Sequence, residues 1–130
     1  MFSHIFIGIT DFPAAAAFYD AVGGALGLKK TIDHPDQGWA GWRGATPRPM
    51  LFIGKPYDGN PAQPGNGPMT AFLAADRASV ERCYAAAMAH GGADEGAPGL
   101  RPHYHADYYA AYFRDPEGNK LCVVCHDAPA

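Results

Sequence analysis

No stretch of this sequence is long and apolar enough to predict a membrane-spanning helix, which needs roughly 20 consecutive apolar residues. Positive charge is not in excess either, because the formal net charge is -3 at pH 7 and no basic stripe occurs, which argues against nucleic acid or an anionic membrane as a partner. The first residues show no basic segment followed by a long apolar one, so we expect no signal peptide. A glycine-rich phosphate-binding motif is absent as well.

Cysteine is scarce, since the chain contains only Cys83, Cys122 and Cys125. A set of three without framework spacing favours a reducing compartment, so we expect a cytoplasmic location. Cys122 and Cys125 form a C-x-x-C pair within the β-branched run LCVVC. Residues three apart on a strand point to opposite faces, so we do not expect a shared zinc or redox site.

Apolar residues, by contrast, make up 48% of the 130 residues, which is enough for a buried core. An apolar run over 2–9 predicts a buried strand, and the spacing of apolar residues over 14–26 predicts a helix. Thr10 or Asp11 can cap this helix, and Gly27 ends it. Short strands are expected at 28–32, 39–43 and 50–53, followed by a Gly-, Pro- and Asn-rich linker at 55–68.

The same order of elements returns after the linker. A strand over 69–74, a helix over 79–90, a loop running to 106 and a hairpin of 109–113 with 121–124 are expected. A shift of 65 positions places Met69 on His4, Asp76 on Asp11 and Tyr84 on Tyr19, and a later shift of 71 places Phe113 on Trp42 and Arg114 on Arg43. One βαβββ unit cannot bury its sheet alone, so this internal repeat predicts two paired units.

Three segments carry a family resemblance: HIFIGITDFPAAAAFYDAVGGALGL, GNGPMTAFLAADRASVERCYAAAMAHGG and, most specific of the three, YFRDPEGNKL. In them the chain resembles the glyoxalase/bleomycin-resistance/dioxygenase superfamily, also called the vicinal oxygen chelate superfamily. The resemblance implies an α+β fold in which two βαβββ modules form a curled mixed sheet around a cleft. It places module 1 at about 1–54, the linker at 55–68 and module 2 at about 69–126 within a single domain, and it implies a homodimer.

The resemblance further implies a divalent metal in many members, held by His or Gln, Glu, His and Glu from the first and last strands of each module. The first of these positions matches His4, and its counterpart in module 2 falls on Met69. The final carboxylate position falls on Cys122, and a shift back by 71 gives Leu51. This set suits a hard or borderline cation poorly, so we expect no cofactor, with His4 as the one ligand if a divalent metal binds. His4, Met69 and Cys122 together would suit copper(I), although Met in a strand is usually core filler.

Several other residues are candidates for the cleft. His103 and His105 lie in RPHYHADYY, which is either a partly exposed loop or a lid in which Arg101, His103, Tyr104 or His105 touches a ligand. Strand alternation separates Tyr108 and Tyr112 from Tyr109, and likewise Trp39 from Trp42, and core packing is the alternative for each aromatic residue. Arg114, Asp115, Glu117 and Lys120 are interpreted as turn chemistry. The predicted ligand-binding cleft contains His4, Leu51, Met69, Cys122, Trp42, Tyr109 and His105.

Two functions remain open at this point. The first is a protein that binds a small, partly apolar molecule without the usual metal site of the family. The second is a lyase, isomerase or dioxygenase of the same superfamily, with either a rearranged metal site or metal-free acid–base catalysis by His4 with Tyr109 or His105. Because one fold hosts many functions, the resemblance alone does not separate the two.

Overall fold

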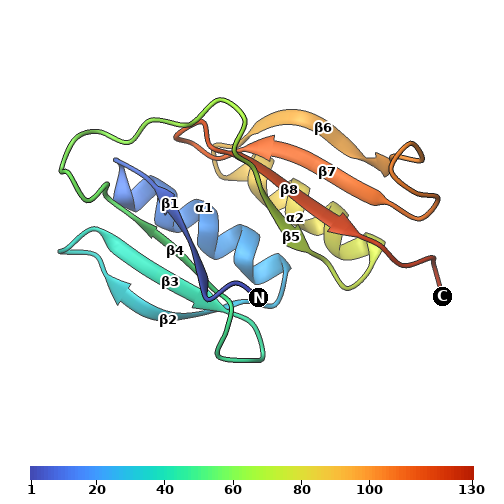
Figure 1. The fold of residues 1–130 in the computed structure, drawn as a ribbon, viewed down its shortest axis with the longest axis horizontal. Helices are drawn as coiled ribbons and strands as arrows, with labels where there is room; N and C mark the ends of the chain where they lie inside the picture. The colour runs from blue at the N-terminus through green and yellow to red at the C-terminus, as the bar shows by residue number, and fades with distance from the viewer.

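The computed structural model describes residues 1–130, which form two helices and eight strands (Figure 1). The first half contains β1 (His4–Gly8), α1 (Phe12–Ala25), β2 (Lys29–His34), β3 (Trp39–Arg43) and β4 (Met50–Gly54). The second half contains β5 (Thr70–Leu73), α2 (Arg77–Ala89), β6 (Ala93–Leu100), β7 (Tyr109–Arg114) and β8 (Lys120–Cys125). Neither helix has the length and hydropathy that a membrane crossing requires.

Each half forms its own four-stranded mixed sheet, in the order β1-β4-β3-β2 for sheet 1 and β5-β8-β7-β6 for sheet 2. The first strand of each half is parallel to the last, and the remaining pairs are antiparallel. This is the α+β fold of two βαβββ modules that the sequence predicts. The two sheets remain separate and do not close into a barrel.

The internal repeat is visible in matching contacts. Asp11 caps α1 by accepting a hydrogen bond from the backbone N–H of Ala14, and Asp76 caps α2 in the same way through Ser79. On the buried faces of the helices, the Tyr19 ring lies 6.1 Å from Trp42, and the Tyr84 ring lies 6.4 Å from Phe113. The shift of 65 positions for the helices, and of 71 for the third strand of each sheet, is therefore confirmed.

The shift of 71 is wrong for the last strand of each module. Leu51 pairs with Trp42, and Leu121 pairs with the equivalent Phe113, so Leu51 corresponds to Leu121, 70 positions later. The cause is the connection before the last strand, which has six residues (44–49) in module 1 and five (115–119) in module 2. A slip of one residue reverses the face of every side chain on a strand. Phe52, not Leu51, is consequently the counterpart of Cys122.

The strand β6 was not predicted, because its residues were assigned to a loop. Its sequence ADEGAPGL lacks the β-branched and aromatic residues that favour strands. Pairing with β7 nevertheless holds it extended, with register shifts on both sides of Gly96. Tertiary pairing therefore overrides local propensity at this edge of sheet 2.

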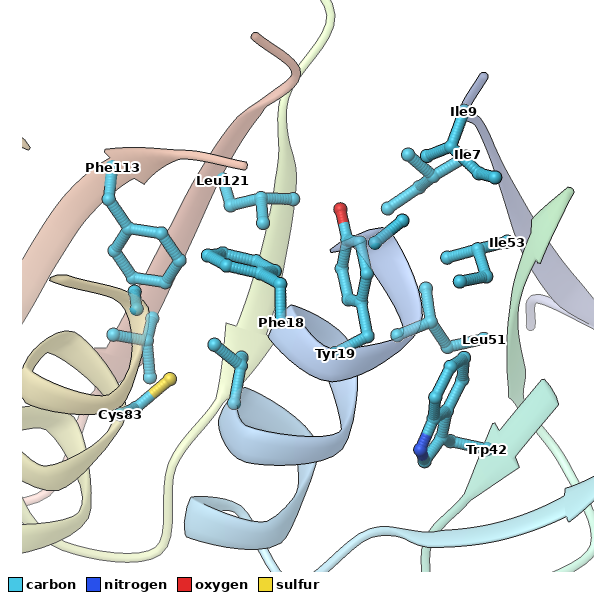
Figure 2. Close-up of a cluster of buried hydrophobic side chains, with 14 of the residues drawn as sticks. Ile7, Ile9, Phe18, Tyr19, Trp42, Leu51, Ile53, Cys83, Phe113 and Leu121 are labelled. Atoms are coloured by element: carbon cyan, nitrogen blue, oxygen red, sulfur yellow. The ribbon is translucent and has the colours of Figure 1, made fainter. Parts of the chain in front are cut away.

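The core lies between the two sheets and is shared by both modules. Figure 2 shows Phe18 and Tyr19 of α1 side by side, with Phe113 and Leu121 of sheet 2 on one flank and Leu51, Ile53 and Trp42 of sheet 1 on the other. One continuous cluster of 20 buried residues spans both halves. Each sheet packs on the helix of its own module, and α1 and α2 pack against each other, so the two modules share one core within one chain.

A buried carboxylate connects the modules at one end of this core. Asp115 is only 3% exposed, and its Oδ2 accepts a 2.6 Å hydrogen bond from the Tyr19 hydroxyl of α1. Its Oδ1 accepts from the backbone N–H groups of Glu117 and Asn119. The Asn119 side chain in turn donates to the backbone carbonyl of Gly8 on β1. The DPEGN turn is thus more than local turn chemistry, since it binds module 2 to the helix and the first strand of module 1.

The surroundings of Tyr19 also affect its ionisation. Burial raises the pKa of Tyr19 well above its ordinary value of about 10, and the neighbouring Asp115 carboxylate raises it further. The phenolate is therefore disfavoured in the folded chain, and Tyr19 remains a hydrogen-bond donor to Asp115.

We predict that Tyr19→Phe lowers the free energy of unfolding by about 1.5–3 kcal/mol, because a hydrogen bond to a buried carboxylate is lost. Tyr84→Phe is the matched control, because Tyr84 occupies the equivalent position but donates to Asp94 at an exposed site. Urea denaturation should show a change of no more than about 0.5 kcal/mol for that variant. The unfolded tyrosine ionises near pH 10, so wild-type stability should fall above about pH 10, and less steeply in Tyr19→Phe. Equal losses in the two variants would contradict the bridging role of Tyr19.

Candidate functional site

Each sheet has one face covered by the core and one face without a helix, which we call the open face. On sheet 1 the open face carries an aromatic layer. The His4 ring stands 5.5 Å edge-on from Phe52, and Trp39 lies 6.0 Å from Phe52. A Cβ at Gly41 would come within 2.7 Å of the Phe52 ring, so glycine at this position lets the ring lie against the strand. His4 is therefore exposed on an aromatic surface and is not a core residue.

The open face of sheet 2 carries hydroxyls and a thiol. The Tyr108 and Tyr112 hydroxyls lie 3.0 Å apart, and the Tyr108 hydroxyl lies 4.0 Å from Cys122 Sγ. Cys122 packs with Ala110 and Val124 on this side, whereas Cys125 belongs to the main core on the other. The predicted separation of the two cysteines by strand alternation is confirmed.

A cleft of ≈ 530 Å³ lies over the open face of sheet 2. Its walls come from the end of the linker and from the tyrosine-rich strands; the lining residues are Gly65, Asn66, Gly67, Pro68, Met69, Tyr104, Tyr108, Tyr112, Arg114 and Lys120. A second, mainly apolar groove of ≈ 490 Å³ lies between β1 and β5 and reaches Trp42 and Leu51. Met69 lines both, so the two concavities meet at the residue that corresponds to His4 in module 1.

Two histidines meet at the rim of the tyrosine cluster. His105 Nε2 lies 2.8 Å from His126 Nδ1, with the rings stacked at 5.1 Å, and both rings stand edge-on to Tyr108. His126 was not among the predicted site residues, because it follows the last predicted strand. The loop 101–108 folds back on β8 and brings His105 to His126, a contact for which the sequence offers no signal.

Three of the predicted cleft residues lie away from the open faces. Trp42 and Leu51 pack on the core side of sheet 1, where they border the apolar groove but not the surface that carries His4. Tyr109 faces α2, and its hydroxyl donates to Glu81 while Arg77 lies over its ring. The prediction that alternating residues face opposite ways is correct, but the choice of Trp42 and Tyr109 picked the side that the helices cover.

Positive charge surrounds Tyr112 on the open face of sheet 2. Lys120 Nζ lies 5.8 Å from the centre of the Tyr112 ring, and the Arg101 guanidinium lies 5.5 Å from it. Neither cation forms an ion pair, whereas Arg114 is bound to Glu95 at 2.6 Å. Burial raises the pKa of Cys122, an effect that Arg101 and Lys120 oppose, and burial also raises the pKa of Tyr112.

The four positions at which the family resemblance implies metal ligands are occupied here, after the correction of the register, by His4, Phe52, Met69 and Cys122. They supply an imidazole, an aromatic ring, a thioether and a thiol whose raised pKa favours the protonated form. No three His, Cys, Asp or Glu side chains are grouped so that they could hold a metal ion. His4 contacts Ser3 and Phe52 on one sheet, and Cys122 contacts Tyr108 on the other. These residues do not fit a divalent metal, which requires several nitrogen or carboxylate ligands that converge.

Comparisons with known proteins agree with this fold. Residues 1–123 match the model of the Glyoxalase/Bleomycin resistance protein/Dioxygenase superfamily. A crystal structure of a glyoxalase/bleomycin resistance protein from Albidiferax ferrireducens T118 is 35% identical, with a TM-score of 0.87, and the match covers 96% of this chain and 98% of that one. The lactoylglutathione lyase from Agrobacterium tumefaciens is 24% identical, with coverage of 96% and 92% and a TM-score of 0.66, which is a likeness of fold alone. No curated protein matches significantly.

The chain therefore belongs to the glyoxalase/bleomycin resistance protein/dioxygenase superfamily. The match to the family model spans nearly the whole chain, and the paired βαβββ modules have the architecture of the solved relatives. Membership in this superfamily establishes the fold. The ligand or reaction has to be inferred from the residues on the open faces, because one fold hosts many functions.

We predict that the three thiols of the native chain react slowly with a disulfide reagent at pH 8. All three are buried and free, burial raises the pKa of Cys83 to about 12, and the pKa of Cys122 is also raised. Only thiolates are nucleophilic, so labelling should become fast and reach three equivalents only after denaturation. Fast native labelling that disappears in Cys122→Ser would show that Cys122 is accessible and ionised, contrary to this account.

Proposed function

We propose that this protein binds a small, partly apolar molecule in the cleft over the open face of sheet 2, without the usual metal site of its family. The observation that carries the proposal is the cleft itself, whose ≈ 530 Å³ lie within the range of small-molecule sites and which is lined by three tyrosines. Tyrosine rings offer apolar contact area, and their hydroxyls orient a ligand by hydrogen bonding.

The neighbouring apolar groove supports a partly apolar ligand. It adjoins the cleft at Met69, whose flexible thioether adapts to differently shaped ligands. A molecule that spans both concavities would place its polar part near Tyr108 and Tyr112 and its apolar part beside Met69.

A second candidate is an enzyme of the same superfamily, either a lyase, an isomerase or a dioxygenase. The observation that favours it is the His105–His126 hydrogen bond beside Tyr108, because one imidazole of such a pair can accept a proton while the other donates one. Pairing of His4 with Tyr109 is not supported, because Tyr109 faces α2. A version with a rearranged metal site requires bound metal, which elemental analysis of the purified protein measures.

We further propose a homodimer in which a second copy covers part of the apolar surface beside the groove. Phe2, Phe6 and Leu73 are 62%, 53% and 75% exposed, which is unusual for large apolar side chains gathered on two neighbouring segments. The edges of β1 and β5 are also unpaired in the sheets. Burial of this surface against a second copy would remove apolar area and strand edges from water.

We predict that protein purified without an affinity tag contains far less than one equivalent of metal by elemental analysis. Addition of Zn²⁺, Ni²⁺, Mn²⁺, Fe²⁺ or Cu⁺ should leave the melting temperature nearly unchanged, because stabilisation by a ligand requires tight binding to the folded state. Near-stoichiometric metal that disappears in His4→Ala would reject the metal-free proposal and favour the enzyme with a rearranged site.

We predict that Leu73→Glu shifts the protein from dimer to monomer in sedimentation velocity experiments. A charge at the centre of an apolar interface is costly to bury. Tyr57→Glu is the control, because Tyr57 is fully exposed in the linker, away from the apolar surface, and this variant should remain dimeric. A wild-type chain that sediments as a monomer at micromolar concentration would refute the homodimer.

A further inference from the structure

The strongest unexplained feature near the cleft is a pair of cations without acidic partners: Lys120, which lines the cleft, and Arg101, which lies beside it. Lys120 on β8, Tyr112 on β7 and Arg101 after β6 lie on neighbouring segments across the open face of sheet 2. The two cations flank the same ring, at 5.8 and 5.5 Å from its centre. Two positive charges near one ring repel each other, and a negative charge placed between them would offset this repulsion.

The local backbone is built to hold Arg101 in this place. A Cβ at Gly96 would lie 3.1 Å from one terminal nitrogen of the guanidinium, and a Cβ at Gly99 would lie 3.1 Å from the other. Both glycines thus make room for the guanidinium to lie close along β6, where it donates to the carbonyl of Ala97 at 2.9 Å. The backbone N–H of Arg101 also donates to the carbonyl of Tyr108, which ties the cation to the tyrosine cluster.

Acidic residues near this part of the sheet are already engaged. Glu95 is bound to Arg114, and Asp94 accepts hydrogen bonds from Tyr84 and from the backbone of Gly96. Asp107 forms its ion pair with Arg77. No acidic side chain of the protein therefore forms an ion pair with Lys120 or Arg101.

Hydroxyl groups beside the cations complete a site for negative charge. Tyr108 and Tyr112 share one hydrogen bond at 3.0 Å, so one of their two hydroxyl protons is left to donate elsewhere. Lys120 and this hydroxyl both line the cleft. An oxyanion in the cleft would accept hydrogen bonds from both, and charge-assisted hydrogen bonds are the stronger class.

We propose that the cleft selects a small organic carboxylate with an apolar body, held by Lys120, by the tyrosine hydroxyls and by the field of Arg101. This inference rests on the proposed binding function and names its ligand class. The apolar body of the ligand would contact Tyr104, Tyr108 and Met69, which form the less charged wall.

The test uses benzoate, benzamide and benzylamine as probes of similar shape and different charge. Binding to the full chain is followed by two-dimensional ¹⁵N–¹H NMR titration at millimolar ligand. Benzoate should bind at least roughly tenfold more tightly than benzamide, the ratio that one charge-assisted hydrogen bond commonly supplies. Benzylamine should bind more weakly than either, and added salt should weaken benzoate selectively.

Variants localise the preference. Lys120→Met keeps the length of the side chain and removes its charge, so it should lose the benzoate preference while still binding benzamide, which also shows that the variant is folded. Lys120→Arg keeps the positive charge and should retain the preference for benzoate. Lys29→Met on β2 of the other sheet removes the same charge elsewhere and should leave the preference intact.

The outcomes separate this inference from the proposed function on which it rests. Equal affinity for benzoate and benzamide, with shifts that map to the cleft, would overturn the anion preference and leave the binding function standing. A benzoate preference that survives in Lys120→Met but disappears in Lys29→Met would place the anion site on sheet 1 and overturn the assignment. If neither benzoate nor benzamide perturbs residues of the cleft, both the inference and the proposed site are rejected.

Discussion

The buried carboxylate of Asp115 is the interaction on which the arrangement of the two modules depends. It accepts hydrogen bonds from Tyr19 and from two backbone N–H groups of its own turn, while Asn119 reaches the backbone of β1. A carboxylate that is only 3% exposed is tolerated because its hydrogen-bonding capacity is used. Through these contacts the turn ties module 2 to α1 and β1 of module 1, beside the core that the two modules share.

The chemistry of the cleft differs from that of a metal site in a consistent way. Where the superfamily places ligands on the first and last strands, this chain presents His4 on an aromatic layer and Cys122 beneath tyrosine hydroxyls. Positive charge comes instead from Lys120 and Arg101, which approach Tyr112 without acidic partners. Cations supplied by side chains favour an anionic ligand through a field that a thioether and a protonated thiol cannot provide.

Local signals in the sequence predicted most of the fold. Asp11 and Asp76 mark both helix starts, and the repeat at 65 positions identified the two modules. The strand β6 was missed because its composition disfavours a strand, and only pairing with β7 holds it extended. The site was less predictable. A one-residue difference in connection length shifted the predicted counterpart of Cys122 from Phe52 to Leu51. His126 meets His105 only because the loop that carries His105 folds back toward β8.

By itself, the sequence determined the order of the elements, the repeat and the alternation of faces, because these follow from local propensity and from the period of a strand. It separated Trp39 from Trp42 and Tyr112 from Tyr109 correctly. Only the tertiary structure decided which member of each pair lies on the open face of its sheet, because that depends on the side of the sheet on which the helices pack. The same packing brought Arg101, Tyr112 and Lys120 together from three neighbouring segments, a meeting that no local pattern encodes.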